Sequence, residues 1–189
     1  MIILLFGPQG SGKSTQAKHL AEAEGLLYVS TGSILRELYE AKAPEGIEAA
    51  SYWLEGNLIP DGMMNKILES YLSSRKPYAG LVFDGYPRTY AQAKALNEQL
   101  HLNNGINLVI ELRVSDEELY RRLATRASTE KRADETPDAI KRRLELYKDR
   151  TNPLLYYYQE QKIPVVKIDG EQPVEAIHAD IMEEVKKLP

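Results

Sequence analysis

The chain carries Gly7-Pro8-Gln9-Gly10-Ser11-Gly12-Lys13-Ser14 directly after an apolar run, residues 2–6, and directly before a segment of helical periodicity, residues 14–24. The octapeptide matches the pattern G-x-x-x-x-G-K-[ST]. In that pattern the glycines let backbone N–H groups curl around a phosphate, the helix N-terminus adds a positive dipole, and the lysine reaches the outer phosphates. A glycine-rich turn with a surface lysine is the alternative, but the flanking strand and helix are the context that phosphate binding requires. The stretch therefore predicts a loop for the phosphates of a nucleoside triphosphate.

Short apolar runs recur beyond this loop and alternate with segments of helical periodicity. The runs are nearly continuous, as in parallel strands that are buried on both faces, and they cover residues 2–6, 26–29, 81–83, 108–112 and 165–168. The clearest helical segments are residues 14–24, 90–100 and 137–148. This alternation predicts an α/β fold built on a doubly wound parallel sheet.

Two segments depart from the alternation, and both are candidates for flaps inserted into the sheet. Residues 31–74 have the pattern of consecutive helices with no strand between them, and residues 127–136 are a polar stretch that we expect to be a loop. Helix starts are expected at Ser115, which opens a capping box, and at Thr136, which precedes Pro137. These signals mark where helices begin after the fourth expected strand.

The composition excludes several classes of protein and site. The net charge of −4 disfavours nucleic acid or an anionic membrane as the main partner. Cysteine is absent, which excludes disulfides, cysteine-ligated zinc, iron–sulfur clusters and a thiol nucleophile, and His19, His101 and His178 have no metal-ligand spacing. The longest apolar run, residues 2–6, is far shorter than a membrane span and lacks the basic leader of a secretory signal. We therefore expect a cytoplasmic protein without a nucleic-acid or membrane partner.

An acidic residue ends one of the expected strands, because Asp84 follows residues 81–83. Ligands of open α/β sheets gather at the carboxyl ends of the strands. A carboxylate there can hold Mg²⁺ directly or through water, which suits a cation that loses its waters reluctantly. Since Asp84-Gly85 is also a common turn pair, capping of the turn is the alternative role. Given the phosphate loop, we favour magnesium.

Arginine is concentrated late in the chain, with eight of the eleven arginines within residues 113–150. This region holds eleven basic and nine acidic residues, so it is no polyanion-binding stripe, and a solvated charged helix is the alternative interpretation. Arginine in place of lysine fits forked recognition of individual phosphates. We expect phosphate ligands at Arg122, Arg126, Arg132 and Arg143, and surface or structural charges at Arg113, Arg121, Arg142 and Arg150.

Five motifs follow one another along the chain. They are GPQGSGKSTQ from Gly7, STGSILR from Ser30, GNLIPD from Gly56, FDGYPRT from Phe83 with Gln92 after it, and the series Arg126, Arg132-Ala-Asp-Glu135 and Arg143-Leu-Glu-Leu-Tyr147. Together they resemble the motifs of the adenylate kinases, within the nucleoside monophosphate kinase family. The likeness runs from about residue 2 to residue 182.

The resemblance implies a single P-loop kinase domain over residues 1–189, with a five-stranded parallel sheet, a monophosphate-binding flap at residues 30–59 and a short lid at residues 126–136. It implies a monomer that transfers a phosphoryl group reversibly, and in line, from Mg-ATP to AMP, giving two ADP. The charges acting on the moving group would be Lys13, Arg88, Arg122, Arg126, Arg132 and Arg143. The expected cofactor is Mg²⁺ at Asp84 and Ser14, and no zinc is expected because the long zinc-bearing lid requires cysteine.

By matching motif, ATP would contact Gly10, Ser11, Gly12, Lys13, Ser14, Thr15 and Arg126, with its adenine or ribose on the backbone near Gln172. AMP would contact Thr31, Arg36, Asn57, Leu58, Ile59, Gly85, Tyr86, Pro87, Arg88, Gln92, Arg132 and Arg143. The Gln92 amide offers an acceptor and a donor that complement the amino group and ring nitrogen of adenine. Capping or packing on its own helix is the alternative role of Gln92.

Three residues depart from the family's pattern. Ser33 replaces the usual aspartate, Ser14 stands where glycine is common, and Gln9 replaces proline or glycine. None of these changes removes a charged ligand. A kinase for UMP or CMP is the alternative enzyme, which Thr31 and Gln92 disfavour. A nucleotide-sensing module without turnover is the alternative from another class, and the complete set of charged ligands disfavours it.

Overall fold

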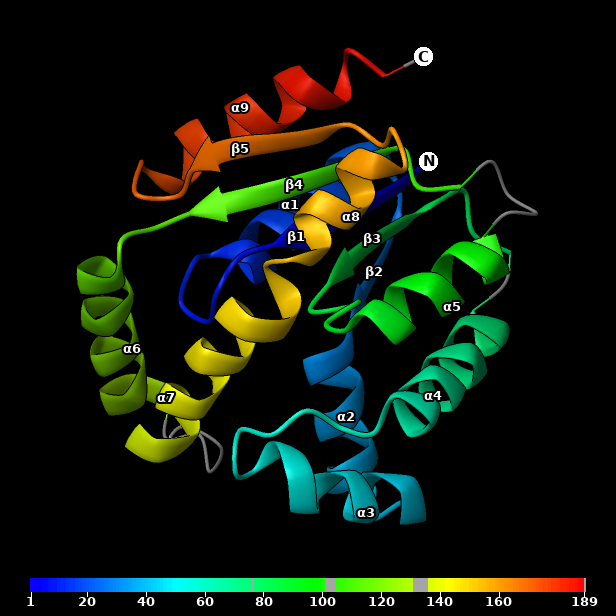
Figure 1. Cartoon of the computed structure of the whole chain (residues 1–189), viewed down its shortest axis with the longest axis vertical. Helices are drawn as coiled ribbons and strands as arrows, with labels where there is room; N and C mark the ends of the chain where they lie inside the picture. The colour runs from blue at the N-terminus through cyan, green and yellow to red at the C-terminus, as the bar shows by residue number, and fades with distance from the viewer. Residues whose placement is uncertain (76, 101–104, 131–135, 189) are drawn as a thin grey trace.

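The computed structural model describes residues 1–75, 77–100, 105–130 and 136–188, and its centre is a five-stranded parallel sheet (Figure 1). The strands are β1 Ile2–Phe6, β2 Leu27–Ser30, β3 Leu81–Asp84, β4 Leu108–Arg113 and β5 Val165–Asp169. Their order across the sheet is β2-β3-β1-β4-β5. Each strand begins within one residue of an apolar run in the sequence, so the predicted α/β fold with a parallel sheet is confirmed.

Helices pack on both faces of the sheet (Figure 1). They are α1 Lys13–Glu24, α2 Thr31–Glu40, α3 Pro44–Trp53, α4 Asp61–Ser74, α5 Tyr90–Leu100, α6 Asp116–Glu130, α7 Pro137–Leu146, α8 Leu154–Glu160 and α9 Val174–Val185, with a π-helical turn, η2, at Tyr147–Thr151. Within the described residues, no helix has the length and apolar character needed to cross a membrane.

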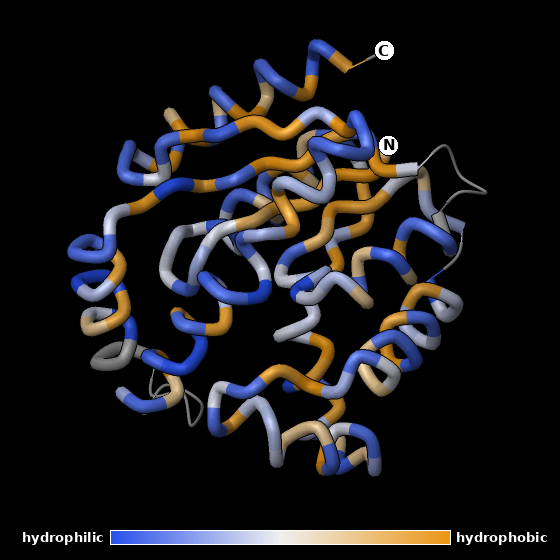
Figure 2. The backbone as a smooth tube through the Cα atoms, viewed as in Figure 1, coloured by the Kyte–Doolittle hydropathy of each residue, from blue (hydrophilic) through white to orange (hydrophobic). Residues whose placement is uncertain are grey.

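Alternation along β1 shows how the two faces are buried. Ile3 and Leu5 pack with apolar residues of α1 and α9 on one face. Ile2, Leu4 and Phe6 pack with residues of α4, α5 and α8 on the other face. Side chains of a strand point to the two faces in turn, so a strand that is covered on both sides needs apolar residues throughout. Figure 2 accordingly shows the strands of the sheet as largely hydrophobic.

The two segments outside the alternation are only partly as expected. Residues 31–74 are consecutive helices, α2, α3 and α4, as the sequence predicts. The expectation of a loop over residues 127–136 is wrong at its start, because α6 continues through Glu130. No glycine or proline interrupts residues 116–130, so nothing in the sequence ends the helix earlier. Residues 131–135 lie outside the described residues.

The predicted helix starts at Thr136 and Ser115 are confirmed. Thr136 Oγ1 accepts a hydrogen bond from the Ala139 N–H at 3.2 Å, and Ser115 Oγ accepts one from the Glu118 N–H at 3.4 Å. The reciprocal half of the capping box is missing, because the Ser115 N–H donates to Glu171 Oε1 at 2.7 Å. The Glu118 carboxylate is therefore available to the arginines that follow it on α6.

The strand register places the expected functional residues at one edge of the sheet. Leu5 of β1 lies opposite Asp84 of β3, and Phe6 lies opposite Glu111 of β4. From β1 the chain crosses to β2 on one side of the sheet, and from β3 it crosses to β4 on the other side, so the winding reverses between the neighbouring strands β1 and β3. Ligands of open α/β sheets bind at such a point, beyond the carboxyl ends of the strands. The phosphate loop leaves β1 there.

Gly46 of α3 provides a test of the close packing between α2 and α3. A Cβ at Gly46 would overlap the backbone of Leu38 and would lie 2.5 Å from the Tyr39 nitrogen. We expect Gly46→Ala to lower the free energy of unfolding by about 1–3 kcal/mol, because the two helices must move apart. Urea unfolding followed by circular dichroism measures this change.

The matched control is Gly62→Ala in α4, where an added Cβ meets nothing within 4 Å. At that position alanine should leave the free energy of unfolding unchanged or raise it by up to about 1 kcal/mol, since it restricts the unfolded chain and favours the helix. Equal effects at the two glycines would contradict the packing argument.

Candidate active site

A pocket lies at the carboxyl ends of β1, β2 and β3 and extends to α2, α7 and η2. The predicted ligands that line it are Lys13, Ser14, Thr31, Arg36, Asn57, Leu58, Ile59, Asp84, Gly85, Tyr86, Pro87, Arg88, Gln92, Arg126 and Arg143. Those that do not are Gly10, Ser11, Gly12, Thr15, Arg122 and Gln172, whereas Arg132 lies outside the described residues. The structure therefore gathers residues of the loop, the flap and the arginine-rich helices around one cavity.

The phosphate loop has the backbone that its glycines predict. Gly10 and Gly12 adopt φ values of 90° and 88°, in the region that favours glycine. A Cβ at Gly10 would also lie 3.2 Å from Leu123 Cγ of α6. Lys13 begins α1, and its Nζ donates a hydrogen bond across the loop to the Pro8 carbonyl at 3.2 Å. The lysine is thus held over the loop by the loop's own backbone.

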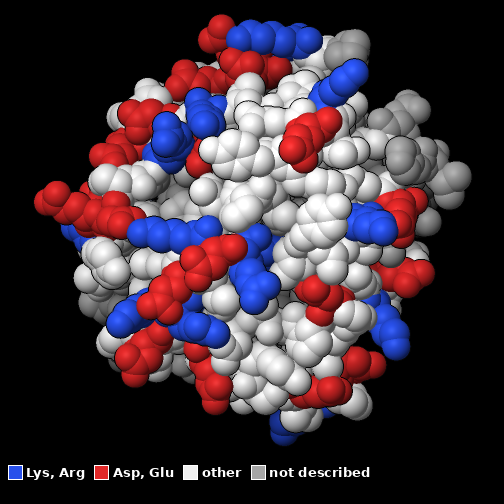
Figure 3. All heavy atoms as spheres, viewed as in Figure 1, with Lys and Arg blue, Asp and Glu red and all other residues white. Residues whose placement is uncertain are grey.

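Positive charge is crowded in this pocket. Burial lowers the pKa of Lys13 and the charges of Arg88, Arg126 and Arg143 add to this effect, while Asp84 acts in the opposite direction; together they bring the pKa to about 8. Burial also lowers the pKa of Arg88, and the charge of Arg143 adds to that effect. An anion placed among such cations stabilises their charged forms. The pocket is therefore suited to phosphate groups, while over the surface seen in Figure 3 basic and acidic side chains are mixed and form no single basic band.

Asp84 and Ser14 offer oxygen ligands in the same pocket. Asp84 is only 4% exposed, and its Oδ2 accepts a hydrogen bond from the Tyr28 hydroxyl at 2.9 Å. Carboxylate and hydroxyl oxygens suit a hard cation such as Mg²⁺. In the part of the chain that the structure describes, no three histidine, cysteine, aspartate or glutamate side chains are grouped to hold a metal. The donor set thus fits an ion that takes its other ligands from phosphate oxygens and water.

On the flap side, three predicted AMP ligands meet at the Gly85 carbonyl. It accepts hydrogen bonds from Thr31 Oγ1 at 2.9 Å and from Arg88 Nε at 2.8 Å. Gly85 has a φ of 78°, and a Cβ there would lie 2.9 Å from Arg88 Nη2, so the turn requires glycine. Arg36 Nη2 has a long hydrogen bond, 3.4 Å, to the hydroxyl of Ser33, the residue that replaces an aspartate. Among the described residues no carboxylate forms an ion pair with Arg36 or Arg88, which leaves their charges for a ligand.

Gln92 lines the pocket, but both ends of its amide bond to the protein. Its Oε1 accepts from the Arg88 N–H at 2.8 Å, and its Nε2 donates to Asp61 Oδ1 at 2.8 Å. Thr89 Oγ1 donates to the same Asp61 oxygen, also at 2.8 Å. Gln92 is 2% exposed. The side chain therefore fixes the turn that carries Arg88, and it must exchange a partner if it is to read a base.

The arginines of α6 and α7 enter the pocket beside the phosphate loop. Arg143 Nη2 donates to the Trp53 carbonyl at the end of α3, at 2.7 Å. With the Gln9 amide in the orientation that satisfies both of its atoms, Gln9 Oε1 accepts from Arg126 Nη2 at 2.9 Å and from Arg143 Nη1 at 3.2 Å. These contacts join the loop after β1 to α6, α7 and the flap.

Arg122 and Gln172, two of the predicted nucleotide ligands outside the pocket lining, have side chains that bond to other parts of the protein. Arg122 Nε donates to Glu118 Oε1 at 2.7 Å, although a Cβ at Gly12 would lie 4.0 Å from Arg122 Nη1. The Gln172 amide donates to Asp180 Oδ2 at 2.8 Å. The prediction for Gln172 concerned its backbone, which these side-chain contacts do not exclude from a nucleotide site.

Sequence reasoning missed three polar groups that hold predicted ligands in place. They are Tyr28 on Asp84, Asp61 on Gln92, and Thr151, whose Oγ1 donates to the Arg88 carbonyl at 3.0 Å. Asp61 was visible as the last residue of a motif. Tyr28 lies in an apolar strand and Thr151 in a polar stretch, so neither carried a signal.

Comparison with known proteins agrees with the motifs. The family model described as adenylate kinase matches residues 5–163. An adenylate kinase of Maricaulis maris is 42% identical over 183 residues, which cover 96% of this chain and 96% of that protein. An adenylate kinase of Bacteroides thetaiotaomicron is 39% identical over 187 residues, 98% of each chain. With the family matched over most of its length and two relatives alike almost from end to end, the chain belongs to the adenylate kinase family.

Proposed function

We propose that this pocket binds ATP and AMP side by side, and that its cations carry the phosphoryl transfer. The chain is an ATP:AMP phosphotransferase, in which ATP and AMP are converted reversibly to two ADP. The observation that carries the site assignment is a charge imbalance. Among the described residues, the pocket is lined by Lys13, Arg36, Arg88, Arg126 and Arg143, with Asp84 as the one carboxylate, on a chain whose net charge is −4.

Little covalent chemistry is left for the protein in this reaction. The attacking group is a phosphate whose second pKa is about 6, so it is largely deprotonated at neutral pH and needs no general base. The protein must align two polyanions, balance charge on the moving group and exclude water. In our proposal Lys13 and the arginines at 88, 122, 126, 132 and 143 act on the moving group. The arginines at 36, 88, 132 and 143 also contact AMP.

Asp84 and Ser14 would hold Mg²⁺, directly or through water. When bound, the ion neutralises charge on the phosphate oxygens of ATP. Asp84 is kept in place for this role by the Tyr28 hydroxyl, at 2.9 Å. The absence of a zinc requirement stays a prediction, which the lack of cysteine supports.

The proposed domain plan is a P-loop core over residues 1–189 with a flap at residues 30–59 and a lid at residues 126–136. The packing of α2 against α3 supports the flap as a unit, since Gly46 of α3 lies against the backbone of Leu38. That the chain acts as a monomer stays a prediction. The cytoplasmic location and the lack of a nucleic-acid or membrane partner also stay predictions; the acidic net charge supports the lack of a nucleic-acid partner.

A coupled assay that offers ATP with AMP, CMP, UMP, GMP or dAMP separately tests the acceptor. We expect AMP to give the highest kcat/KM. A preference for CMP or UMP would indicate a pyrimidine-specific kinase. Binding without turnover for every acceptor would favour a nucleotide-sensing module.

Nucleotide binding should take up protons near pH 8. The pKa of Lys13 is lowered to about 8 in the free protein, and an incoming polyphosphate raises it again, so protons bind with the ligand and affinity falls as pH rises through 8. Calorimetry with metal-free ATP in two buffers of different ionisation enthalpy should show uptake of up to about half a proton at pH 8. Lys13→Arg keeps the charge but does not titrate there, so equal uptake in this variant would contradict the assignment to Lys13.

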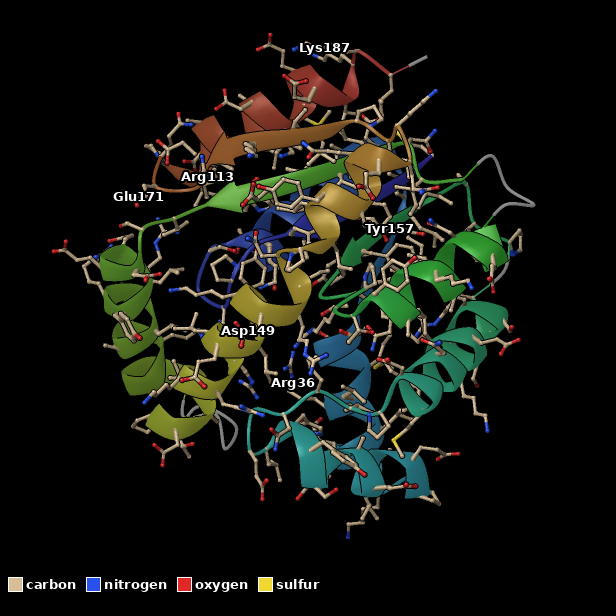
Figure 4. The ribbon with its side chains drawn as sticks, viewed as in Figure 1. Arg36, Arg113, Asp149, Tyr157, Glu171 and Lys187 are labelled. Carbon is tan, nitrogen blue, oxygen red and sulfur yellow. The ribbon has the colours of Figure 1, made fainter. Side chains whose placement is uncertain are left out.

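Replacing an arginine that lines the pocket should reduce kcat far more than replacing an arginine outside the pocket. Arg88→Ala and Arg143→Ala should each reduce kcat by about 100-fold or more, because each removes a charge from the moving group or its acceptor. Arg113→Ala is the control, since Figure 4 shows Arg113 at the end of β4, beside Glu171 and away from Arg36. Steady-state kinetics with both nucleotides measures kcat for the three variants. Equal, mild reductions of kcat at all three positions would favour the interpretation that these arginines are solvated surface charges.

Substitutions at Gln92 can distinguish two roles of its side chain, hydrogen bonding to the adenine base and holding the turn that carries Arg88. Gln92→Glu places a second carboxylate against Asp61 Oδ1 and removes the donor that adenine would need. We expect kcat/KM for AMP to fall roughly 5- to 150-fold, which corresponds to a loss of about 1–3 kcal/mol in transition-state stabilisation. In the double variant with Asp61→Asn, the new amide can donate to Glu at position 92 and restore the anchor. Recovery of the AMP parameters in that double variant would show that Gln92 only positions the turn.

A further inference from the structure

We infer that Gln9 is a positioning residue, whose amide oxygen holds the guanidinium groups of Arg126 and Arg143 beside the phosphate loop. The inference rests on the proposed function, because it assigns those two arginines to the transferred phosphates. It concerns this chain in particular, since Gln9 stands where the family pattern has proline or glycine, neither of which has a side-chain acceptor.

The geometry fixes the chemistry of the contact. One terminal atom of the Gln9 amide lies 2.9 Å from Arg126 Nη2 and 3.2 Å from Arg143 Nη1. Guanidinium nitrogens donate and do not accept, so the atom between them must be the amide oxygen. All three side chains line the pocket. A single neutral acceptor therefore joins two arginines that belong to different helices, α6 and α7.

An acceptor at this place offsets a repulsion that the pocket creates. Arg126 and Arg143 both act on Lys13, since each lowers its pKa. Like charges at such short range move apart into solvent unless something holds them. The Trp53 carbonyl already holds Arg143 through Nη2 at 2.7 Å, and Gln9 adds a bond through its Nη1. Gln9 thus ties both guanidinium groups to the loop that binds the triphosphate.

A neutral amide suits this role better than a carboxylate. A glutamate at position 9 would hold the arginines more tightly, but its charge would cancel part of theirs and repel the phosphates. The amide oxygen orients the guanidinium groups and, being neutral, does not itself cancel their charges. Gln9 itself need not touch a reacting atom, so its effect depends on the two arginines being present.

Binding of inorganic tripolyphosphate, followed by calorimetry without magnesium, tests the cluster without any base or turnover. Gln9→Met keeps the length of the side chain and removes the acceptor, and we expect it to weaken binding about tenfold. Gln9→Glu should weaken binding more than Gln9→Met does. Gln159→Met, at an exposed glutamine of α8 outside the pocket, is the matched control and should bind as the unchanged chain does.

A double-mutant cycle separates positioning from loop shape. In a chain that already carries Arg126→Ala and Arg143→Ala, Gln9→Met should have no further effect on tripolyphosphate binding. In the otherwise unchanged chain, Gln9→Met should lower kcat about tenfold with a smaller change in the KM for AMP. A loss in binding that persists without the arginines, or equal affinities for Gln9→Met and Gln9→Glu, would overturn the inference. If the chain bound tripolyphosphate as expected but did not phosphorylate AMP, the proposed function would fail and the assignment of Gln9 would stand.

Discussion

The rest of the site depends on one electrostatic constraint, the confinement of several cations in a partly buried pocket where the described residues supply a single carboxylate. Burial and the neighbouring arginines lower the pKa of Lys13 to about 8, which means that the empty pocket disfavours its own charge. Bringing two nucleotides together creates the opposite problem, since their phosphates repel. Each set of charges removes the destabilisation of the other. The reaction therefore needs a frame that keeps the cations together while no ligand is present.

The sheet and its turns supply that frame. Leu5 beside Asp84 in the register fixes the phosphate loop against the end of β3. Backbone carbonyls then serve as neutral acceptors for the cations, namely Pro8 for Lys13, Gly85 for Arg88 and Trp53 for Arg143. A carbonyl holds a cation in place without cancelling its charge, which a carboxylate would do. The same logic extends to the amide oxygen of Gln9.

The sequence predicts well those parts of the site whose structure depends on residues that are neighbours in the chain. The loop from Gly7 to Ser14 is a contiguous motif whose glycines are required by its own backbone, and Asp84 ends a strand whose apolar character is plain. The supports of these residues were not predictable, because they join distant segments. Thr151 reaches the Arg88 carbonyl across 63 positions, and Tyr28 reaches Asp84 across 56. The end of α6 was misjudged for another reason, since a polar composition suits an exposed helix as well as a loop.

Contacts between the flap and α7 link the two sides of the pocket. Arg142 Nε donates to Asn57 Oδ1 at 3.1 Å, next to the bond from Arg143 to the Trp53 carbonyl. Between them lies Gly56, whose φ is 79° and where a Cβ would overlap the backbone of Ala139. The backbones of the flap and of α7 can therefore approach this closely only because residue 56 has no side chain. Arg143 reaches the phosphate loop from the same helix, so the contact at Gly56 joins the flap to the helix that carries an arginine we propose to act on the transferred group.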